Sequence, residues 1–429
     1  MDRLYKLENS VKKYDWGSPQ WIPNLLNREN PSGEPWAELW MGVHPAGPSH
    51  TRRGSAAHSL DTLIRSDPAF FLGETAAQGY STLPFLFKLL AAEHPLSMQA
   101  HPNREQALTG WERENAAGLA LDDPVRNYRD RNHKPELLCA LSPFQVICGF
   151  RELGLAKDML KRLCSLPLPN ALASALAPLQ EAPDLKAFLE SLLSIPAPVC
   201  LALGDWIMHT AQKFAPELPQ PYAAEWEIVA HLARLFPGDP WLLAPVILNT
   251  LTLQPGESIF LPSAVLHSYL SGFGVELMAN SDNVLRGGLS AKHRDIPELL
   301  KTLSYIPYKP EILLPTYAKG REFASYPVRC GEFSLSFRNS AENSNAPIVY
   351  TPNGPAIALN IQGELLISLE GELLSLEPGE SAFIAPGRAP AQIRWSGAYT
   401  AFIAETGSLA DNPGTFGDFW EPPLSGGTG

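Results

Sequence analysis

Four side chains of types that bind metal ions stand out in the sequence: Gln99, His101, Glu136 and His267. Residues two apart in a strand project to the same face, so a strand through Gln99 and His101 would direct both into one cavity. Pro135 cannot donate to a strand ladder, which places Glu136 at a bend or sheet edge where its carboxylate can turn inward. Two imidazoles, a carboxylate and an amide oxygen suit zinc, with manganese or iron as alternatives.

The surrounding sequence predicts strands that would position these side chains, interrupted by a block of helices. Apolar runs at 85–90 and 247–253 have the pattern of strands. In the segment 274–289, a polar and charged run follows directly on a hydrophobic strand pattern. Apolar residues then recur at three- and four-residue spacing, which is helical, over 153–166, 170–181, 182–193 and 223–236. We therefore expect a helical insertion between two β segments.

An internal repeat indicates the type of β fold. Pro-Gly-Glu-Ser occurs at 255–258 and again at 378–381, followed each time by apolar residues and a proline. A strand, a tight turn and a strand repeated in this way are typical of cupin-type jelly-roll barrels. The first copy leads to His267, whereas no histidine follows His293. The second barrel is therefore expected to lack the metal site and to have a structural role.

Composition limits the class of protein. The 429 residues exceed one average core, and 45% apolar with 18% charged residues is typical of a globular protein. A net charge of −12 disfavours nucleic acid as a partner, although a local cluster of cations can still bind an anionic sugar phosphate. Five cysteines without a C-x-x-C pair favour reduced thiols and a cytoplasmic location. No apolar run is long enough to predict a membrane span or a secretion signal.

The metal-ligand segments and the run at 274–289 together resemble type I phosphomannose isomerases, the zinc-dependent mannose-6-phosphate isomerases. The resemblance extends to residues 14–18, 37–42 and 44–45 and covers about residues 10 to 295. It implies a mainly β protein with an α-helical insertion, built from two cupin-type jelly-roll barrels and one helical domain. The expected division is a catalytic cupin domain over 1–150 and 241–305, a helical insertion over 151–240 and a C-terminal cupin-like domain over 306–429.

The same resemblance implies a set of site residues. One Zn²⁺ per chain is expected on Gln99, His101, Glu136 and His267. The remaining residues expected at the site are the catalytic candidates Arg286, Glu276, Lys134, Lys292 and Asp282, and the substrate-binding candidates Ser97, Lys88, Trp16 and Tyr269. His133 is a further candidate for the pocket wall, while His44 and His94 are assigned no role.

The implied reaction is the isomerisation of mannose 6-phosphate and fructose 6-phosphate through an enediol(ate). Such a reaction needs stabilisation of the enediolate oxygens, one acid–base group and a cationic pocket for the phosphate. For proton transfer we rank Glu276 first, Lys134 second and Lys292 third, and Asp282 is expected to help open the sugar ring. Arg286 has the planar fork that suits a phosphate or an enediolate, and Ser97 with Lys88 is the first choice for the phosphate. The protein is expected to be a monomer.

Two other functions fit parts of the sequence. A cupin dioxygenase would use two histidines and one carboxylate on a redox-active metal, but Gln99 and the candidate phosphate-binding cations argue against it. A non-catalytic cupin that binds a sugar or stores metal would have no need of an acid–base set such as Glu276, Lys134 and Arg286.

Overall fold

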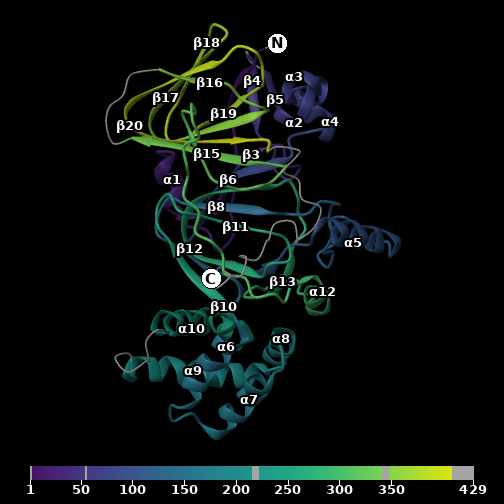
Figure 1. Ribbon diagram of the computed structural model, residues 1–429, viewed down its shortest axis with the longest axis vertical. Helices are drawn as coiled ribbons and strands as arrows, with labels where there is room; N and C mark the ends of the chain where they lie inside the picture. The colour runs from purple at the N-terminus through teal and green to yellow at the C-terminus, as the bar shows by residue number, and fades with distance from the viewer. Residues whose placement is uncertain (1, 54–55, 215–221, 341–346, 408–429) are drawn as a thin grey trace, which may run out of the picture.

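Two antiparallel β-sheets lie one above the other, and a bundle of helices extends from one end of the molecule (Figure 1). The computed structural model describes residues 2–53, 56–214, 222–340 and 347–407. The expected mainly β architecture with a helical insertion is confirmed, and it is built from elements that lie far apart in the sequence.

The first sheet has ten strands and carries the candidate metal ligands. These strands are β2 (Ser10–Lys12), β3 (Glu38–Gly42), β6 (Phe85–Ala92), β7 (Met98–Ala100), β8 (Glu136–Ala140), β9 (Phe144–Phe150), β10 (Leu248–Leu253), β11 (Ser258–Leu261), β12 (His267–Ala279) and β13 (Leu285–Gly288). The long strand β12 is the centre of this sheet, because it pairs with β6, β7, β8 and β9. Its thirteen residues span the width of the barrel and bring side chains from all four neighbours together.

The second sheet has eight strands, and one of them comes from the N-terminus. The strands are β1 (Leu4–Leu7), β14 (Ala324–Ser325), β15 (Ser334–Ser340), β16 (Ile348–Tyr350), β17 (Ala356–Leu369), β18 (Glu372–Leu376), β19 (Ser381–Ile384) and β20 (Ala391–Glu405). Strand β1 pairs with β19, so it belongs to the C-terminal sheet and not to the catalytic part in which the sequence division placed it. We propose to keep the three-part division with β1 reassigned; residues 408–429 of the C-terminal part lie outside the described residues.

Both copies of the Pro-Gly-Glu-Ser repeat form the same turn before a strand. Gly256 and Gly379 have φ values of 88° and 82°, a region that favours glycine. In each turn the glutamate after the glycine accepts a hydrogen bond from the backbone N–H three residues earlier, at Gln254 and at Glu377. The repeat predicted from sequence is therefore a repeat of local structure.

The helical bundle follows β9 and returns the chain to β10. Its helices are α6 (Leu153–Cys164), α7 (Asn170–Glu181), α8 (Leu185–Leu193), α9 (Ala197–Phe214), α10 (Ala223–Leu235) and α11 (Ala244–Ile247). Four of them match the predicted helices to within a few residues, whereas α9 was not predicted, because its apolar residues form a nearly continuous run. Other helices flank the sheets: α1 (Trp21–Leu25), α2 (Leu60–Ser66), α3 (Pro68–Leu72), α4 (Glu74–Gly79), α5 (Arg104–Ala116) and α12 (Ile296–Thr302). The two-stranded sheet of β4 (His50–Arg53) and β5 (Ala56–Ser59) completes the fold.

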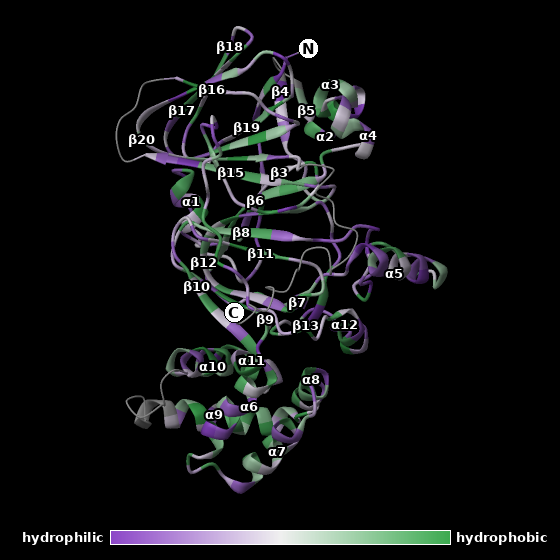
Figure 2. Cartoon of the chain, viewed as in Figure 1, coloured by the Kyte–Doolittle hydropathy of each residue, from purple (hydrophilic) through white to green (hydrophobic). Residues whose placement is uncertain are grey.

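The two sheets share one apolar core. Phe85, Phe87 and Leu89 of β6 are fully buried in the same cluster as Phe383 of β19 and Phe402 of β20. Figure 2 shows β6 in mostly hydrophobic colours along its length. This continuous contact holds the C-terminal sheet directly against the strands that carry the site.

Among the described residues, no single helix has the length and apolar character needed to cross a bilayer. One sharply bent pair, Leu185–Leu193 with Ala197–Thr210, meets those criteria by length and composition only.

Candidate active site

Three of the four expected metal ligands converge at the floor of a cavity of about 690 Å³. The ligand atoms of His101, Glu136 and His267 all lie within 4.8 Å of one another. The distances from the Glu136 carboxylate oxygens are 3.2 Å to Nε2 of His101 and 3.3 Å to Nε2 of His267. Strand pairing produces this arrangement, because Glu136 and His267 are the first residues of β8 and β12, and His101 follows β7 directly.

Both histidines are held in the tautomer that a metal requires. Nδ1 of His101 lies 2.7 Å from the carbonyl oxygen of Asn283, and Nδ1 of His267 lies 3.0 Å from that of Val265. A carbonyl oxygen can only accept, so each Nδ1 carries the proton and each Nε2 presents a lone pair. Burial and the nearby charge of Lys134 lower the pKa of His101 to about 4, which keeps this ring neutral.

The buried atoms that face one another at this point have no hydrogen-bond partners among the described residues. They are Nε2 of His101, Nε2 of His267 and Oε2 of Glu136. A buried polar group without a hydrogen-bond partner destabilises the folded protein, unless an ion binds between such groups and accepts their lone pairs. The donor set fits zinc, with imidazole nitrogen and carboxylate oxygen as ligands.

Gln99 lies beside this cluster. It pairs with His267 in the register of β7 with β12 and lines the cavity. Its Oε1 atom accepts a hydrogen bond of 3.2 Å from the Ser97 hydroxyl. Ser97 and Gln99 thus face the same cavity, as the two-residue spacing predicts.

The Glu136 carboxylate has a cation beside it as well as the histidines. Nζ of Lys134 lies 3.0 Å from Oε1 of Glu136, and both residues are buried. Burial alone would raise the pKa of Glu136, but the charge of Lys134 and the close contacts with the two histidines outweigh it and lower that pKa well below its usual value. Glu136 is therefore held as a carboxylate.

A second buried charge cluster also lines the cavity. Nζ of Lys88 lies 2.7 Å from the Glu276 carboxylate and 3.4 Å from that of Glu38, which also accepts a 2.7 Å hydrogen bond from Trp40. Lys88 is on the central part of the sheet, between β12 and β3, and not at a sheet edge. Burial opposes charge on Lys88, but the two carboxylates outweigh it and raise its pKa, whereas burial raises the pKa of Glu276. The Lys88 ammonium is thus already paired with two carboxylates.

Three other cations reach the cavity without a carboxylate partner. Arg286 of β13, Arg129 and Lys292 line it, and within the described part of the chain none of them forms an ion pair. Burial and then the charge of Arg129 lower the pKa of Arg286, while burial and Arg286 lower that of Lys292. Uncompensated like charges at one end of a cavity are typical of a site that binds an anion.

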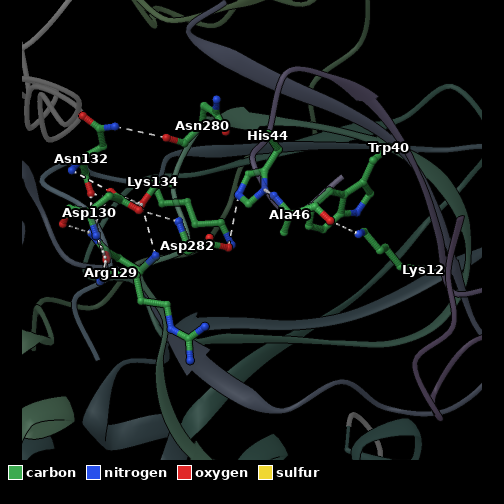
Figure 3. A network of polar contacts seen from close by, with 12 residues as sticks. Lys12, Trp40, His44, Ala46, Arg129, Asp130, Asn132, Lys134, Asn280 and Asp282 are labelled. Atoms are coloured by element: carbon green, nitrogen blue, oxygen red, sulfur yellow. Dashed lines mark hydrogen bonds and ion pairs between the residues drawn. The ribbon is translucent and has the colours of Figure 1, made fainter. Parts of the chain in front are cut away.

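A histidine–aspartate pair lies at the rim. Nε2 of His44 is 3.2 Å from Oδ1 of Asp282, and the backbone N–H of Ala46 donates to Nδ1 of His44, so the Nε2 proton points at Asp282. Figure 3 shows Asp282 between His44 and Lys134. The Asp282 backbone N–H donates to the Asp130 carboxylate over 2.7 Å, which fixes the loop.

The structure brings the expected residues together with few exceptions. Eleven of the thirteen line the cavity, while His101 and His267 lie buried beneath it, next to Glu136. His133, expected at the pocket wall, instead contacts Glu332 of the C-terminal part. The side chains of Trp16 and Tyr269 are at the wall as expected, and burial followed by the charges of Glu276 and Glu136 raises the pKa of Tyr269.

Tyr14, Glu38, His44 and Arg129 are among the cavity residues that were not predicted. Tyr14, Glu38 and His44 lie in N-terminal segments that carry the resemblance, so their presence there was a usable signal. Burial and the charge of Glu38 raise the pKa of Tyr14 to about 12, and Lys292 lies 5.1 Å from its ring centre. Arg129 has no comparable signal, because it stands in an irregular loop among other charged residues.

Comparison with known proteins agrees with this geometry. The family described as phosphomannose isomerase type I, catalytic domain, matches residues 4–153. The mannose-6-phosphate isomerase of Escherichia coli (strain K12) is 36% identical over 363 residues, which cover 84% of this chain and 89% of that protein. The mannose-6-phosphate isomerase of Homo sapiens is 32% identical over 384 residues, covering 85% of this chain and 88% of that protein.

Solved structures show the same similarity. A zinc-bound mannose 6-phosphate isomerase superposes with a TM-score of 0.83 at 33% identity, covering 95% of this chain and all of that chain. A mutant phosphomannose isomerase from Salmonella typhimurium has the same TM-score at 32% identity and the same coverage. The zinc-type ligand geometry, the cavity and the matched relatives agree, and the chain belongs to the type I phosphomannose isomerase family.

Proposed function

We propose that this protein interconverts mannose 6-phosphate and fructose 6-phosphate and depends on zinc. The observation that carries this proposal is the arrangement of one cavity. A metal-type cluster lies at its floor, and the cavity is also lined by a buried carboxylate–lysine pair and by three cations without an ion-pair partner among the described residues. These are the three parts that the isomerisation of a sugar phosphate needs.

Zinc would be held by His101, Glu136 and His267, with Gln99 as the fourth ligand. When bound, zinc supplies a Lewis acid that stabilises negative charge on an oxygen of the sugar. The chain itself fixes the ligands beforehand, because backbone carbonyls hold both imidazole rings and Lys134 holds the carboxylate.

We assign the phosphate to Arg286, Arg129 and Lys292 and not to Lys88. The charge of Lys88 is already paired with Glu276 and Glu38, whereas the other three cations have no carboxylate partner among the described residues. An Arg129→Met variant should raise KM about tenfold with a smaller change in kcat, because a phosphate contact anchors the substrate and takes no part in the proton transfer. Ser97, which also lines the cavity, is retained as a neutral donor.

Glu276 remains the first candidate for proton transfer. In the direction from aldose to ketose, its carboxylate would take the proton from C2 while O1 gains one; the proton then returns to C1 as O2 loses one. Its pKa is raised by burial, which brings a carboxylate closer to the operating range of a general base. Lys88 would hold Glu276 in place over 2.7 Å, and Lys134 and Lys292 remain the second and third candidates.

Asp282 is proposed to open the sugar ring with the help of His44. Ring opening moves the proton of the hydroxyl at the anomeric carbon to the ring oxygen, so it needs an acid–base group at the mouth of the cavity. Asp282 is exposed there, and His44 fixes its orientation by donating from Nε2.

One assay tests the function. Fructose 6-phosphate formation from mannose 6-phosphate is followed in a coupled assay before and after removal of metal with a chelator and return of zinc. We expect turnover that the chelator abolishes and zinc restores. Absence of turnover with zinc bound would overturn the proposal. Turnover without any metal would mean that the four ligand residues have only a structural role.

We also propose that the protein works as a cytoplasmic monomer without nucleic acid or membrane partners. All five cysteines are free thiols and four are buried, which suits a reducing compartment. Sedimentation equilibrium would test the monomer, since an assembly would give a multiple of 46.9 kDa.

A further inference from the structure

A carboxylate from the C-terminal part of the chain reaches across to the catalytic sheet. Glu332, just before β15, is 5% exposed. One of its oxygens, Oε1, lies 2.7 Å from Nη2 of Arg104 and 2.8 Å from Nε2 of His133. The other oxygen, Oε2, accepts a 3.3 Å contact from the Cys330 thiol, so the orientation of the carboxylate is fixed.

The two partners of Glu332 lie 3.1 Å from each other, and each is close in the sequence to one of the converging ligands. Arg104 is three residues after His101, and His133 is three residues before Glu136. One carboxylate thus holds two separate segments, each of which carries one of the three converging ligands.

Both connections are short and stiff. Asn103 and Gln106 form a capping box at the start of α5, so the first helical turn, which carries Arg104 and begins two residues after His101, is fixed by two hydrogen bonds. Between His133 and Glu136, Pro135 restricts both itself and the residue before it. A displacement of Arg104 or His133 would therefore be transmitted to the ligand three residues away.

Adhesion between the two sheets does not require Glu332. The shared apolar core already joins them, with Phe87 and Phe383 fully buried. A buried ion pair is weak evidence for stability, because desolvation offsets much of the attraction between the charges. What a buried charged contact supplies instead is a defined geometry, since moving it leaves charges unpaired.

We propose that Glu332 is a positioning residue for the zinc site, through which the C-terminal barrel sets the separation of His101 and Glu136. Glu332 does not line the cavity, so it has no contact with substrate. This inference rests on the proposed function only in that the site is used with zinc bound.

The test uses the full-length protein and reads the metal site directly. Zinc release to a chromogenic chelator and the visible absorption of the Co²⁺-substituted protein are measured for Glu332→Gln. We expect zinc release about tenfold faster, the low end of the effect of losing a group that supports a ligand, and a changed Co²⁺ spectrum. In the assay kcat should fall while KM changes little, because the substrate contacts remain.

Glu322→Gln is the matched control. Glu322 is another carboxylate of the C-terminal part; it is paired with Arg338 over 3.1 Å and forms no ion pair with the catalytic sheet among the described residues. Its removal should leave zinc release and the Co²⁺ spectrum unchanged. Equal zinc release and equal spectra for Glu332→Gln and the wild type would overturn the proposal.

A double-mutant cycle separates positioning from general loosening. If Glu332 acts through His133, adding Glu332→Gln to His133→Asn should change zinc release by much less than it does alone. Additive effects would contradict the proposed route. If Glu332→Gln does not fold, Arg104→Gln removes the half-exposed partner and should still accelerate zinc release, and an unchanged rate would count against the proposal. These metal readouts stand apart from turnover, so a failure of the proposed reaction would be recognised separately.

Discussion

The two barrels share a local design and differ in what it carries. In each, the turn with a left-handed glycine leads into a strand that pairs with its neighbour over four residues: β11 with β8, and β19 with β17. Aligning these registers places Ser258 opposite Cys139 in one barrel and Ser381 opposite Leu359 in the other. The same alignment places Ala356 at the position of Glu136.

The neighbouring strands extend the comparison. Strand β20 pairs with β17 in the second barrel in the same way that β12 pairs with β8 in the first. In this alignment Ile403 occupies the position that corresponds to Glu276. β6 pairs with β12 as β15 pairs with β20, which puts Ser336 at the position of Lys88. Among the described residues, the only group of three or more ligand-type side chains close enough for a metal is the one in the first barrel. The barrel fold thus forms in both halves, whereas the metal-type site depends on side chains at a few positions of the first barrel.

The second barrel still has a cavity of about 660 Å³, lined by Ser325, Ser336 and Glu405. Similar size with different side chains makes it an internal control for the first cavity. Matched substitutions in the two cavities separate chemistry from the stability of the fold.

The largest contrast is expected between Glu136→Gln and Glu405→Gln. Both residues are buried carboxylates, but only Glu136 faces the two histidines. Glu136→Gln should weaken zinc binding by roughly 10³-fold, more than the roughly 10–100-fold effect of losing a group that only supports a ligand, and turnover should fall with it. Glu405→Gln should leave both within twofold. Zinc titration and steady-state kinetics check this pair, and comparable losses in both variants would break the contrast between the barrels.

The next contrast is between the arginines of the two cavities, Arg286 and Arg321. Arg286→Met should lower kcat/KM by roughly 10²–10³-fold, the effect of removing one donor to a developing oxyanion or phosphate. Arg321→Met should have no effect on kinetics. Arg286→Lys tests the planar fork, since a point charge should restore only part of the activity. Full activity of the Arg286→Met variant would show that Arg286 does not bind the phosphate.

The contact between the barrels predicts a pH dependence of stability. Burial alone would raise the pKa of Glu332. The hydrogen bond with His133, the charge of His133 and the charge of Arg104 together outweigh burial and lower this pKa to about 2. A carboxylate with a depressed pKa stabilises the folded state above its unfolded pKa of about 4.3, and this contribution disappears as the pH falls to about 2. The free energy of unfolding of the wild type should exceed that of Glu332→Gln by up to ~3 kcal/mol at pH 6. Denaturant titrations should show this difference shrinking below pH 4.5, and a constant difference would contradict the pairing.

The smallest contrast is between the two repeated glycines. Alanine at Gly256 meets no atom within 4 Å, so only its positive φ should destabilise the protein, by about 1 kcal/mol. Alanine at Gly379 would also approach Leu26 Cδ2 to 2.6 Å, which should add about 1 kcal/mol. Thermal unfolding of the two variants would check the order, and equal losses would mean that Leu26 moves aside.

Much of this architecture could be predicted because its patterns are local. The helices from Leu153 to Glu181 follow the apolar spacing, and the Pro-Gly-Glu-Ser repeat predicts the same turn twice. The candidate metal ligands could be named because the segments around them resemble motifs of the family, whereas a Gln-x-His pair alone is weak evidence. The helices α2, α3 and α4 between Leu60 and Gly79 were missed, since they are short and end at proline or glycine.

What the sequence could not provide was the pairing between distant segments. The lysine at position 88 looked like a free cation, and only the register of β6 with β12 and β3 shows Glu276 and Glu38 beside it. His133 was assigned to the pocket from its neighbours in the chain, although its side chain faces Glu332, 199 residues away. Arg129 was overlooked because a charged residue in a loop is usually a surface residue, and only the folded loop brings it next to Arg286.

Strand β1 has a consequence for how the chain reaches this fold. Leu4–Leu7 are synthesised long before their partners on β19, Ser381–Ile384. The pairing of β1 in the C-terminal barrel therefore cannot form until β19 has been synthesised. A pairing across such a long loop is slow to form, and its unpaired edge is open to other strands in the meantime. During synthesis, the N-terminal strand is thus a point at which chaperones or aggregation would compete with folding.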